Sequence, residues 1–146
     1  MLLLLALGAG LVLANIGADE RGVAEREAKR LAGALEHAAA LAQWRNETLG
    51  VSADGGAYRF WRRDTDGRWT PFAGDDVLAM RTLPPGLAVA PSSYAGAPAR
   101  SDAIVPFRAS GRNEPYSLVL ASVQWTIIVS ADPLNRVAFA AAPVSR

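Results

Sequence analysis

Hydrophobic and polar positions divide the chain into three zones. Residues 1–18 carry no charge and are mostly Leu, Ala and Gly. Over residues 19–46, apolar positions recur at steps of three and four, which predicts an amphipathic helix. After Asn46, short apolar segments alternate with Gly, Asp and Pro, which predicts antiparallel strands. We therefore expect an apolar stem over 1–18, an amphipathic helix over 19–46 and an antiparallel β-domain over 47–146.

The predicted helix has one small, apolar face suited to close packing on a sheet. Arg26, Lys29, Arg30, Glu36 and His37 fall on the other face. The inward stripe consists of Ala24, Ala28, Leu31, Leu35, Ala38, Ala39 and Ala42. In the segment 57–63, Tyr58 and Phe60 share one face of the strand, which can cover the helix. We expect Leu31, Leu35 and Ala38 to pack against these two aromatic residues.

The remaining strands are predicted from β-branched or alternating runs bounded by turn residues. Seven segments are predicted to be strands: 47–53, 57–63, 68–72, 104–108, 116–122, 123–131 and 136–139. Two more, 77–83 and 86–90, are candidates for further strands around the Pro84-Pro85 break. Residues 91–101, rich in Pro, Ser, Ala and Gly, are predicted to form a long loop, either a partner contact or a disordered connector. The expected fold class is α+β, with one long helix and seven or eight short antiparallel strands.

The stem has three interpretations. It is a secretory signal peptide with a small-residue cleavage site, an uncleaved membrane anchor, or an anchor whose first turns are missing from the chain. Eighteen helical residues extend about 27 Å, against a hydrocarbon core of about 30 Å. No basic residue flanks the apolar run, so charge does not decide among these interpretations.

Composition excludes several kinds of chemistry. The chain has 146 residues, a net charge of +1, no cysteine and a single histidine. Disulfides, thiolate zinc sites and cysteine nucleophiles are therefore absent, and so are sites that need two imidazoles. Well-mixed charges give no electrostatic footprint for nucleic acid. We predict no catalytic residue, no metal site and no cofactor.

Local clusters are explained by ordinary folding chemistry. The run 64–67 begins like a calcium loop but lacks the acidic spacing, so we interpret it as a hairpin turn. Asp75 and Asp76 are expected in a solvated loop, and His37 on a solvated helix face. The arginines and tryptophans of 59–69 are interpreted as cross-strand packing. Trp44, Trp61, Trp69 and Trp125 are all expected in the core or at its rim.

Several strings, in their order along the chain, resemble the H-type minor pseudopilins (GspH) of the bacterial type II secretion system and, more distantly, the FimT and FimU minor pilins. The strings are the helix 25–44, the strand–turn–strand 55–64, the tryptophan hairpin 67–71, and the segments 83–87, 104–111, 115–118 and 125–127. Together they cover nearly the whole chain. At 135 the resemblance implies a turn glycine, which Asn135 can replace in the left-handed conformation.

The resemblance implies a pilin-like fold, with a long N-terminal helix on a two-sheet β-domain, and a non-enzymatic role in starting or capping a secretion fibre. It further implies a single pass in the bacterial inner membrane, a periplasmic β-domain, and assembly with other minor and major pseudopilins through N-terminal helices. Prepilin peptidase is an implied partner of the full-length chain, and nucleic acid is not a partner. The implied membrane and assembly residues are Leu2, Leu3, Leu4, Leu5, Leu7, Leu11, Val12 and Leu13.

The beginning of the chain departs from that family. Its members have a short basic leader ending in Gly, followed by an aromatic residue and a docking Glu, and none of these occurs before or within residues 2–13. Two explanations are open: the missing residues are encoded just upstream of Met1, or this copy cannot be processed. We expect the first. Two alternatives remain open: a type IV minor pilin, and an exported β-domain binding module whose residues 1–18 are a signal peptide.

Overall fold

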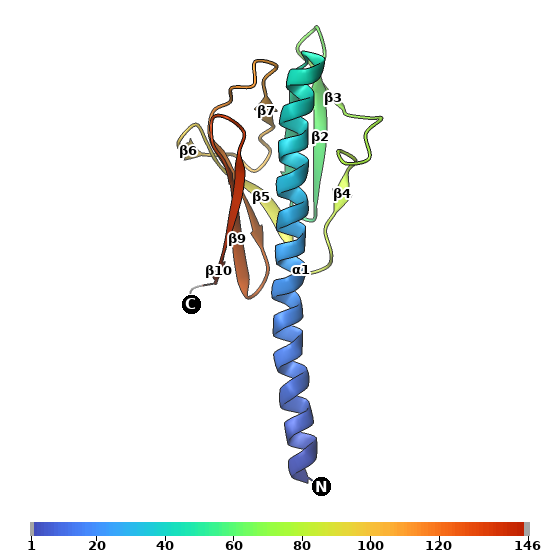
Figure 1. The fold of residues 1–146 in the computed structure, drawn as a ribbon, viewed down its shortest axis with the longest axis vertical. Coiled ribbons are helices and arrows are strands. Elements are labelled where there is room, and N and C mark those ends of the chain that lie inside the picture. Colours follow the sequence, from blue (N-terminus) through green and yellow to red (C-terminus); the bar gives the residue numbers. More distant parts are fainter. Residues whose placement is uncertain (1, 145–146) are drawn as a thin grey trace.

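The computed structural model describes the backbone of residues 2–144 and the side chains of residues 19–144. One helix, α1 (Leu2–Arg45), runs along the long axis and projects beyond the β-domain at its N-terminal end (Figure 1). The helix ends where Asn46 takes a φ of 54°, a left-handed conformation that Asn tolerates at this position. The amide of Glu47 then donates to the carbonyl of Ala42 over 3.0 Å, closing the last turn.

The first sheet follows the helix directly. Its strands are β1 (Leu49–Asp54), β2 (Ala57–Arg63), β3 (Trp69–Pro71), β4 (Arg81–Thr82) and β7 (Val105–Phe107). Their order is β3-β2-β1-β7, and β4 pairs with the start of β2. The β1–β2 hairpin sets Val51 opposite Phe60 and Ala53 opposite Tyr58. Because paired residues lie on the same side of a sheet, these four side chains form one apolar face.

The second sheet holds the rest of the chain. Its strands are β5 (Ala88–Tyr94), β6 (Ala97–Pro98), β8 (Tyr116–Ala121), β9 (Trp125–Ala131) and β10 (Val137–Pro143), in the order β10-β9-β8-β5-β6. All of its pairings are antiparallel. The register shifts between Pro91 and Ser93, which marks a bulge in β5 where it pairs with β8.

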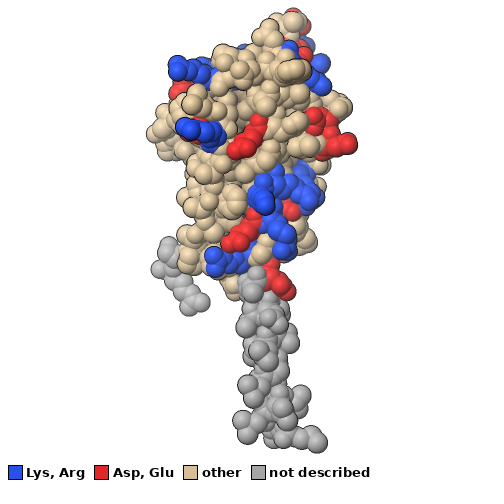
Figure 2. All heavy atoms as spheres, viewed as in Figure 1, with Lys and Arg blue, Asp and Glu red and all other residues tan. Residues whose placement is uncertain are grey.

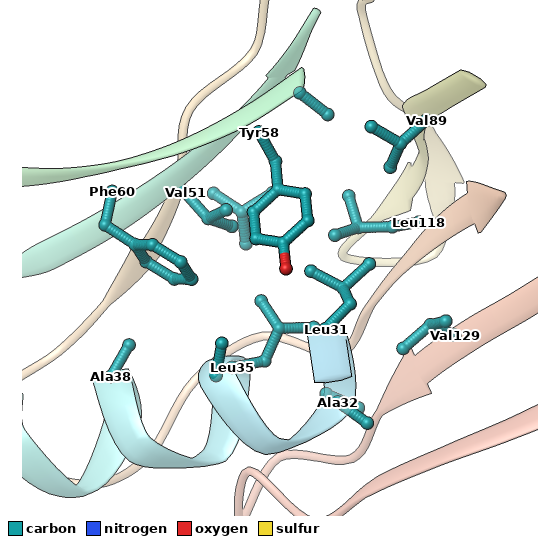
Figure 3. Close-up of a cluster of buried hydrophobic side chains, with 14 of the residues drawn as sticks. Leu31, Ala32, Leu35, Ala38, Val51, Tyr58, Phe60, Val89, Leu118 and Val129 are labelled. Atoms are coloured by element: carbon teal, nitrogen blue, oxygen red, sulfur yellow. The ribbon is translucent and has the colours of Figure 1, made fainter. Parts of the chain in front are cut away.

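One hydrophobic core joins the helix to both sheets. In Figure 3, Leu31 and Leu35 of α1 point toward Tyr58 and Val51 of the first sheet, with Leu118 and Val129 of the second sheet beside them. The largest fully buried side chains are Phe60, Phe107, Leu31, Leu35, Leu49, Leu78, Leu118, Leu120, Ile127, Val51, Val89 and Val105. Since these come from all three layers, neither sheet has a complete core without the helix.

The predicted fold class is confirmed: one long helix packs on two antiparallel sheets. Three segments were predicted wrongly. Residues 91–101 are not a loop, because β5 continues to Tyr94 and turns through Gly96 into β6. Of the predicted strand 77–83 only β4 is a strand, since Asp75 organises a turn before it. The last strand runs on to Pro143, and the described residues hold ten strands rather than seven or eight.

Candidate assembly surface

The packed face of α1 is the first part of the site. The structure places Leu31, Leu35 and Ala38 in the core, each 0% exposed, facing the first sheet. Tyr58 and Phe60 lie opposite, with ring centroids 6.1 Å apart in an edge-on arrangement. Burial, followed by the nearby Glu27 carboxylate, raises the pKa of Tyr58 to about 12. This face fixes the helix and is not available to a partner.

A buried ion pair ties α1 to β4. Arg81 Nη2 donates to Glu27 Oε1 over 2.6 Å, and its Nε donates to Oε2 over 3.3 Å. The Glu27 side chain is only 8% exposed. This two-point contact with Glu27 raises the pKa of Arg81, so the guanidinium stays charged. No local pattern in the sequence predicts this pair, because 54 positions separate its members.

Two further contacts hold other parts of the chain on the helix. His37 Nε2 lies 2.8 Å from Asp75 Oδ2, and its hydrogen bond is the main cause of the lowered pKa of Asp75. The same carboxylate accepts the amides of Val77 and Leu78. On the opposite side, Glu36 Oε1 accepts the amide of Val137 in β10 over 3.1 Å. The prediction of a solvated Asp75 was therefore wrong, since its carboxylate accepts these hydrogen bonds and is only 18% exposed. His37 lies on the helix face with 40% of its side chain exposed, and its pairing with Asp75 was not predicted.

The outward face of α1 carries charged and small residues. Arg26, Lys29 and Arg30 are exposed, and none of them forms an ion pair among residues 19–144. Figure 2 shows basic and acidic side chains mixed along this part of the molecule. One turn further, Gly33 is exposed and has open space around it. This face is polar and uncovered for several turns.

Trp44 is an exposed tryptophan near the C-terminal end of α1. Its side chain is 88% exposed, the highest fraction among the exposed large apolar residues of the described part of the chain. Its predicted place in or beside the core was wrong, because it follows the exposed Ala40 by one helical turn. The sequence offered that signal: the apolar stripe ends at Ala42, and Trp44 lies outside it. Exposed tryptophan at a rigid site is typical of binding hot spots.

The outer face of the first sheet has a second group of aromatic residues. Trp61 Nε1 donates to Ser52 Oγ over 2.8 Å, and Arg59 lies 5.5 Å from the centre of the Trp61 ring. Arg63 lies 5.7 Å from the centre of the Trp69 ring. The Trp61–Ser52 and Arg63–Trp69 contacts join neighbouring strands, as predicted, whereas Arg59 and Trp61 lie on the same strand, β2. Trp61, Trp69 and Trp125 are each half-buried, in keeping with a rim position.

Turn residues behave as the sequence predicted. Asp64 Oδ1 accepts the amides of Asp66 and Arg68, which makes 64–67 a closed hairpin turn. Asn135 has a φ of 64°, the left-handed conformation expected at this position. Its amide group donates to the carbonyl of Gly111, and its side-chain oxygen accepts from the buried Asn113. This network fixes the β9–β10 turn against the 108–113 loop.

The predicted stem residues Leu2, Leu3, Leu4, Leu5, Leu7, Leu11, Val12 and Leu13 have side chains outside the described residues. Their backbone belongs to α1. In the described part of the chain, no helix combines the length and the apolar character that crossing a membrane requires. Within the same part, no three His, Asp or Glu side chains gather as a metal site would need.

Comparison with known proteins gives one family match. A family model described as type II transport protein GspH matches residues 27–132. This range runs from the buried Glu27 on α1 to the turn after β9, and so includes parts of the helix and of both sheets. No curated protein matches the chain.

Solved structures of low identity share the fold. The minor pseudopilin EpsH from the type 2 secretion system of Vibrio cholerae superposes with a TM-score of 0.65 at 20% identity, covering 81% of this chain and 96% of that one. The type IV minor pilin FimU of Pseudomonas aeruginosa gives 0.60 at 13%, covering 83% and 90%. GspH of E. coli gives 0.57 at 20%, covering 82% and 88%.

Proposed function

Since the chain belongs to the GspH family of type II transport proteins, we propose that it is a minor pseudopilin, a subunit that helps to start or cap the type II secretion fibre. In this role it is a structural protein rather than an enzyme, and it assists protein export across the outer membrane. The observation that carries the proposal is the family match over the helix and both sheets. The geometry supports it, because α1 is fixed to the β-domain along one face and left uncovered along the other.

The stem supplies the contact with neighbouring subunits. An uncharged Leu, Ala and Gly helix can pass from lipid into a bundle of similar helices at little cost, because its side chains meet an apolar environment in both. Residues 1–18 are thus the membrane-embedded part in this proposal, 19–46 the amphipathic half of the helix, and 47–146 the β-domain. Leu2, Leu3, Leu4, Leu5, Leu7, Leu11, Val12 and Leu13 would contact the other minor and major pseudopilins.

The proposed location follows from this division. The stem crosses the bacterial inner membrane once and the β-domain lies in the periplasm. Prepilin peptidase is a further partner in this proposal.

A type IV minor pilin is the second candidate function. The likeness to FimU, at a TM-score of 0.60, favours it as the alternative, because the same fold serves both kinds of fibre. Deleting the gene separates the two. A pseudopilin deletion blocks release of exported enzymes and leaves surface pili intact, whereas a minor-pilin deletion has the opposite result.

Rescue of secretion tests the assembly role. In a deletion strain, the wild-type gene should restore the release of exported proteins to the medium. The double substitution Leu7→Arg and Leu11→Arg should abolish rescue, because two charges in an apolar bundle cost several kcal/mol. The matched control, Val77→Arg and Leu134→Arg, introduces the same two charges at exposed apolar positions of the β-domain and should leave rescue in place. Full rescue by the stem variant would contradict the proposal.

The signal-peptide alternative has its own test. If residues 1–18 are a cleaved signal, the protein recovered from the periplasm has a mature N-terminus near residue 15 or 19. Its intact mass would then be lower than that of the full chain by the mass of the removed segment. A retained stem gives the larger mass and removes this alternative.

A further inference from the structure

The end of the β-domain from which the stem projects is formed by two turns with apolar tips. The β8–β9 turn (122–124) carries Val123, which is 86% exposed. The turn 84–87 carries the exposed Pro85 and Gly86. In Figure 1 the β8–β9 turn and the C-terminal end of β10 lie at the end of the domain that faces the free half of α1. We refer to residues 84–87, 122–124 and Val144 as the stem-side rim.

The rim lies directly beside the first charged turn of the helix. A groove of about 340 Å³ is lined by Asp19, Glu20 and Val23 of α1 together with the turn 84–87 and Ser122. The guanidinium of Arg21 lies 4.8 Å from the centre of the Trp125 ring, immediately after the β8–β9 turn. Val144 joins the rim because its amide donates to the carbonyl of Gln124 over 2.9 Å.

Helix geometry gives the height of the rim above the stem. Charge first occurs at Asp19, and α1 continues across this position without a break. Asp19 and Val23 lie about 1.5 and 7.5 Å beyond Ala18 at about 1.5 Å per residue. One polar headgroup layer of a bilayer is about 5 to 8 Å thick. The rim therefore occupies the height of one headgroup layer if the uncharged stem fills the hydrocarbon.

The chemistry of the rim suits that layer. Tryptophan and arginine are residues that proteins place at membrane–water interfaces, where an apolar body and a polar group are both satisfied. Arg21 and Trp125 meet at this height, and Val123 and Val144 supply small apolar contacts beside them. Asp19, Glu20 and Arg21 together carry a net charge of −1, so charge gives the rim no attraction to anionic lipid.

We propose that the stem-side rim inserts into the phospholipid headgroup layer, so that the β-domain rests on the membrane in a fixed orientation. The inference builds on the proposed function, because it requires the stem to be in the bilayer. The contact is apolar, so it forms on zwitterionic lipid and does not depend on salt. The occupant of the rim is lipid rather than another protein chain.

The chain has no cysteine, which makes a labelling experiment direct. Three single-cysteine variants of the full chain are labelled with an environment-sensitive fluorophore: Val123→Cys on the rim, Thr65→Cys at the opposite end of the domain, and Leu11→Cys in the stem. Thr65 is exposed and lies in the β2–β3 turn, so it is the matched control for an exposed turn residue. Each variant is placed in phosphatidylcholine vesicles, with and without phosphatidylglycerol.

Two quenchers give the result. Spin-labelled headgroups should quench the label at 123, and aqueous iodide should reach it several-fold less well than the label at 65. The extent of quenching by the headgroups and the ratio of iodide access at the two positions should be the same at low and high salt and in both lipid mixtures. The label at 11 should respond to a spin label on the acyl chains.

Three outcomes would overturn the inference. Equal iodide access at 123 and 65, with the stem label in hydrocarbon, rejects the rim contact and leaves the proposed function standing. Protection from iodide at 123 without headgroup quenching means that a protein chain, not lipid, covers the rim. A stem label that stays in water rejects both the membrane stem and the rim contact.

Discussion

At the residue scale, Tyr58 shows how burial makes the fold sensitive to high pH. Its hydroxyl lies in the core and its pKa is raised to about 12, so the folded protein keeps the proton above pH 10 while the unfolded chain releases it. A raised pKa leaves stability unchanged below pH 10 and lowers it as the pH rises toward 12. The loss is about 1.4 kcal/mol per pH unit.

Denaturant unfolding between pH 9 and pH 11 measures this effect. Tyr58→Phe should reduce the alkaline loss of stability without removing all of it, because burial also raises the pKa of Tyr116. The half-buried Phe72 is the control, because Phe72→Leu changes an aromatic side chain without a hydroxyl and should keep the full slope. An unchanged slope in Tyr58→Phe would show that the hydroxyl does not stay protonated in the fold.

Trp44 is the residue whose exposure the packing of this chain does not explain. Because it is 88% exposed, Trp44→Ala should change the free energy of unfolding by less than about 0.5 kcal/mol. If Trp44 is a contact with the next subunit of the fibre, the same change should sharply reduce cross-linking to other pseudopilins in cells. Met80→Ala, at another exposed apolar position, should not. Equal cross-linking of Trp44→Ala and Met80→Ala would show that Trp44 does not contact the next subunit.

At the element scale, the Glu27–Arg81 pair joins α1 to β4 through a nearly buried contact. Arg81→Leu leaves the carboxylate of Glu27 without its partner and should cost about 3 kcal/mol. The double variant Glu27→Leu and Arg81→Leu should recover most of that loss, because no charge is then left in the core. Urea unfolding of the wild type, both single variants and the double variant measures the coupling. Additive effects would mean that the two side chains do not depend on each other.

Substituting alanine for glycine should have opposite effects on stability at two positions, Gly50 and Gly33. At Gly50 in β1, an added Cβ would lie 2.7 Å from Ile104 Cγ2 and 3.0 Å from the Trp69 ring, so Gly50→Ala should cost about 1–3 kcal/mol. At Gly33 on the exposed face of α1, nothing lies within 4 Å. Gly33→Ala should therefore stabilise the helix by up to about 1 kcal/mol. Thermal unfolding compares the two variants. A lower melting temperature for Gly33→Ala as well as for Gly50→Ala would contradict the open, helical position of Gly33.

Local pattern predicted the elements whose signal is local. Apolar positions spaced by three and four residues correctly predicted the packed half of α1. The Asp-Gly and Gly-Gly turns correctly predicted the hairpins of β1, β2 and β3. The prediction of a loop over 91–101 was wrong, because Pro91 is buried where β5 pairs with β8 and a bulge accommodates it, which composition does not reveal. The contacts of α1 with Arg81 and Asp75 could not be predicted from local pattern, because they join residues 54 and 38 positions apart in the sequence.

At the scale of the whole molecule, the half of α1 that packs in the core and the half that forms the stem are separate parts of the same helix. Every buried residue of the described chain lies between Ala24 and Ala131, so no core contact among residues 19–144 calls for the first eighteen residues. The helix therefore serves two purposes along its length. Its second half completes the core between the sheets, and its first half is free for the membrane and for neighbouring subunits in the proposed function.

This separation predicts the behaviour of a shortened chain. A fragment of residues 19–146, exported with a cleavable signal, should fold in the periplasm without detergent and give the far-UV circular dichroism of a mixed helix and sheet protein. It should fail to restore secretion in the deletion strain, because the fibre contact has been removed and the fold has not. The full-length variant Leu35→Ala is the opposite control: it keeps the stem but loses a fully buried side chain, at a cost of about 2–5 kcal/mol. Restoration of secretion by the fragment would place the activity in the β-domain and favour an exported binding module over an assembly subunit.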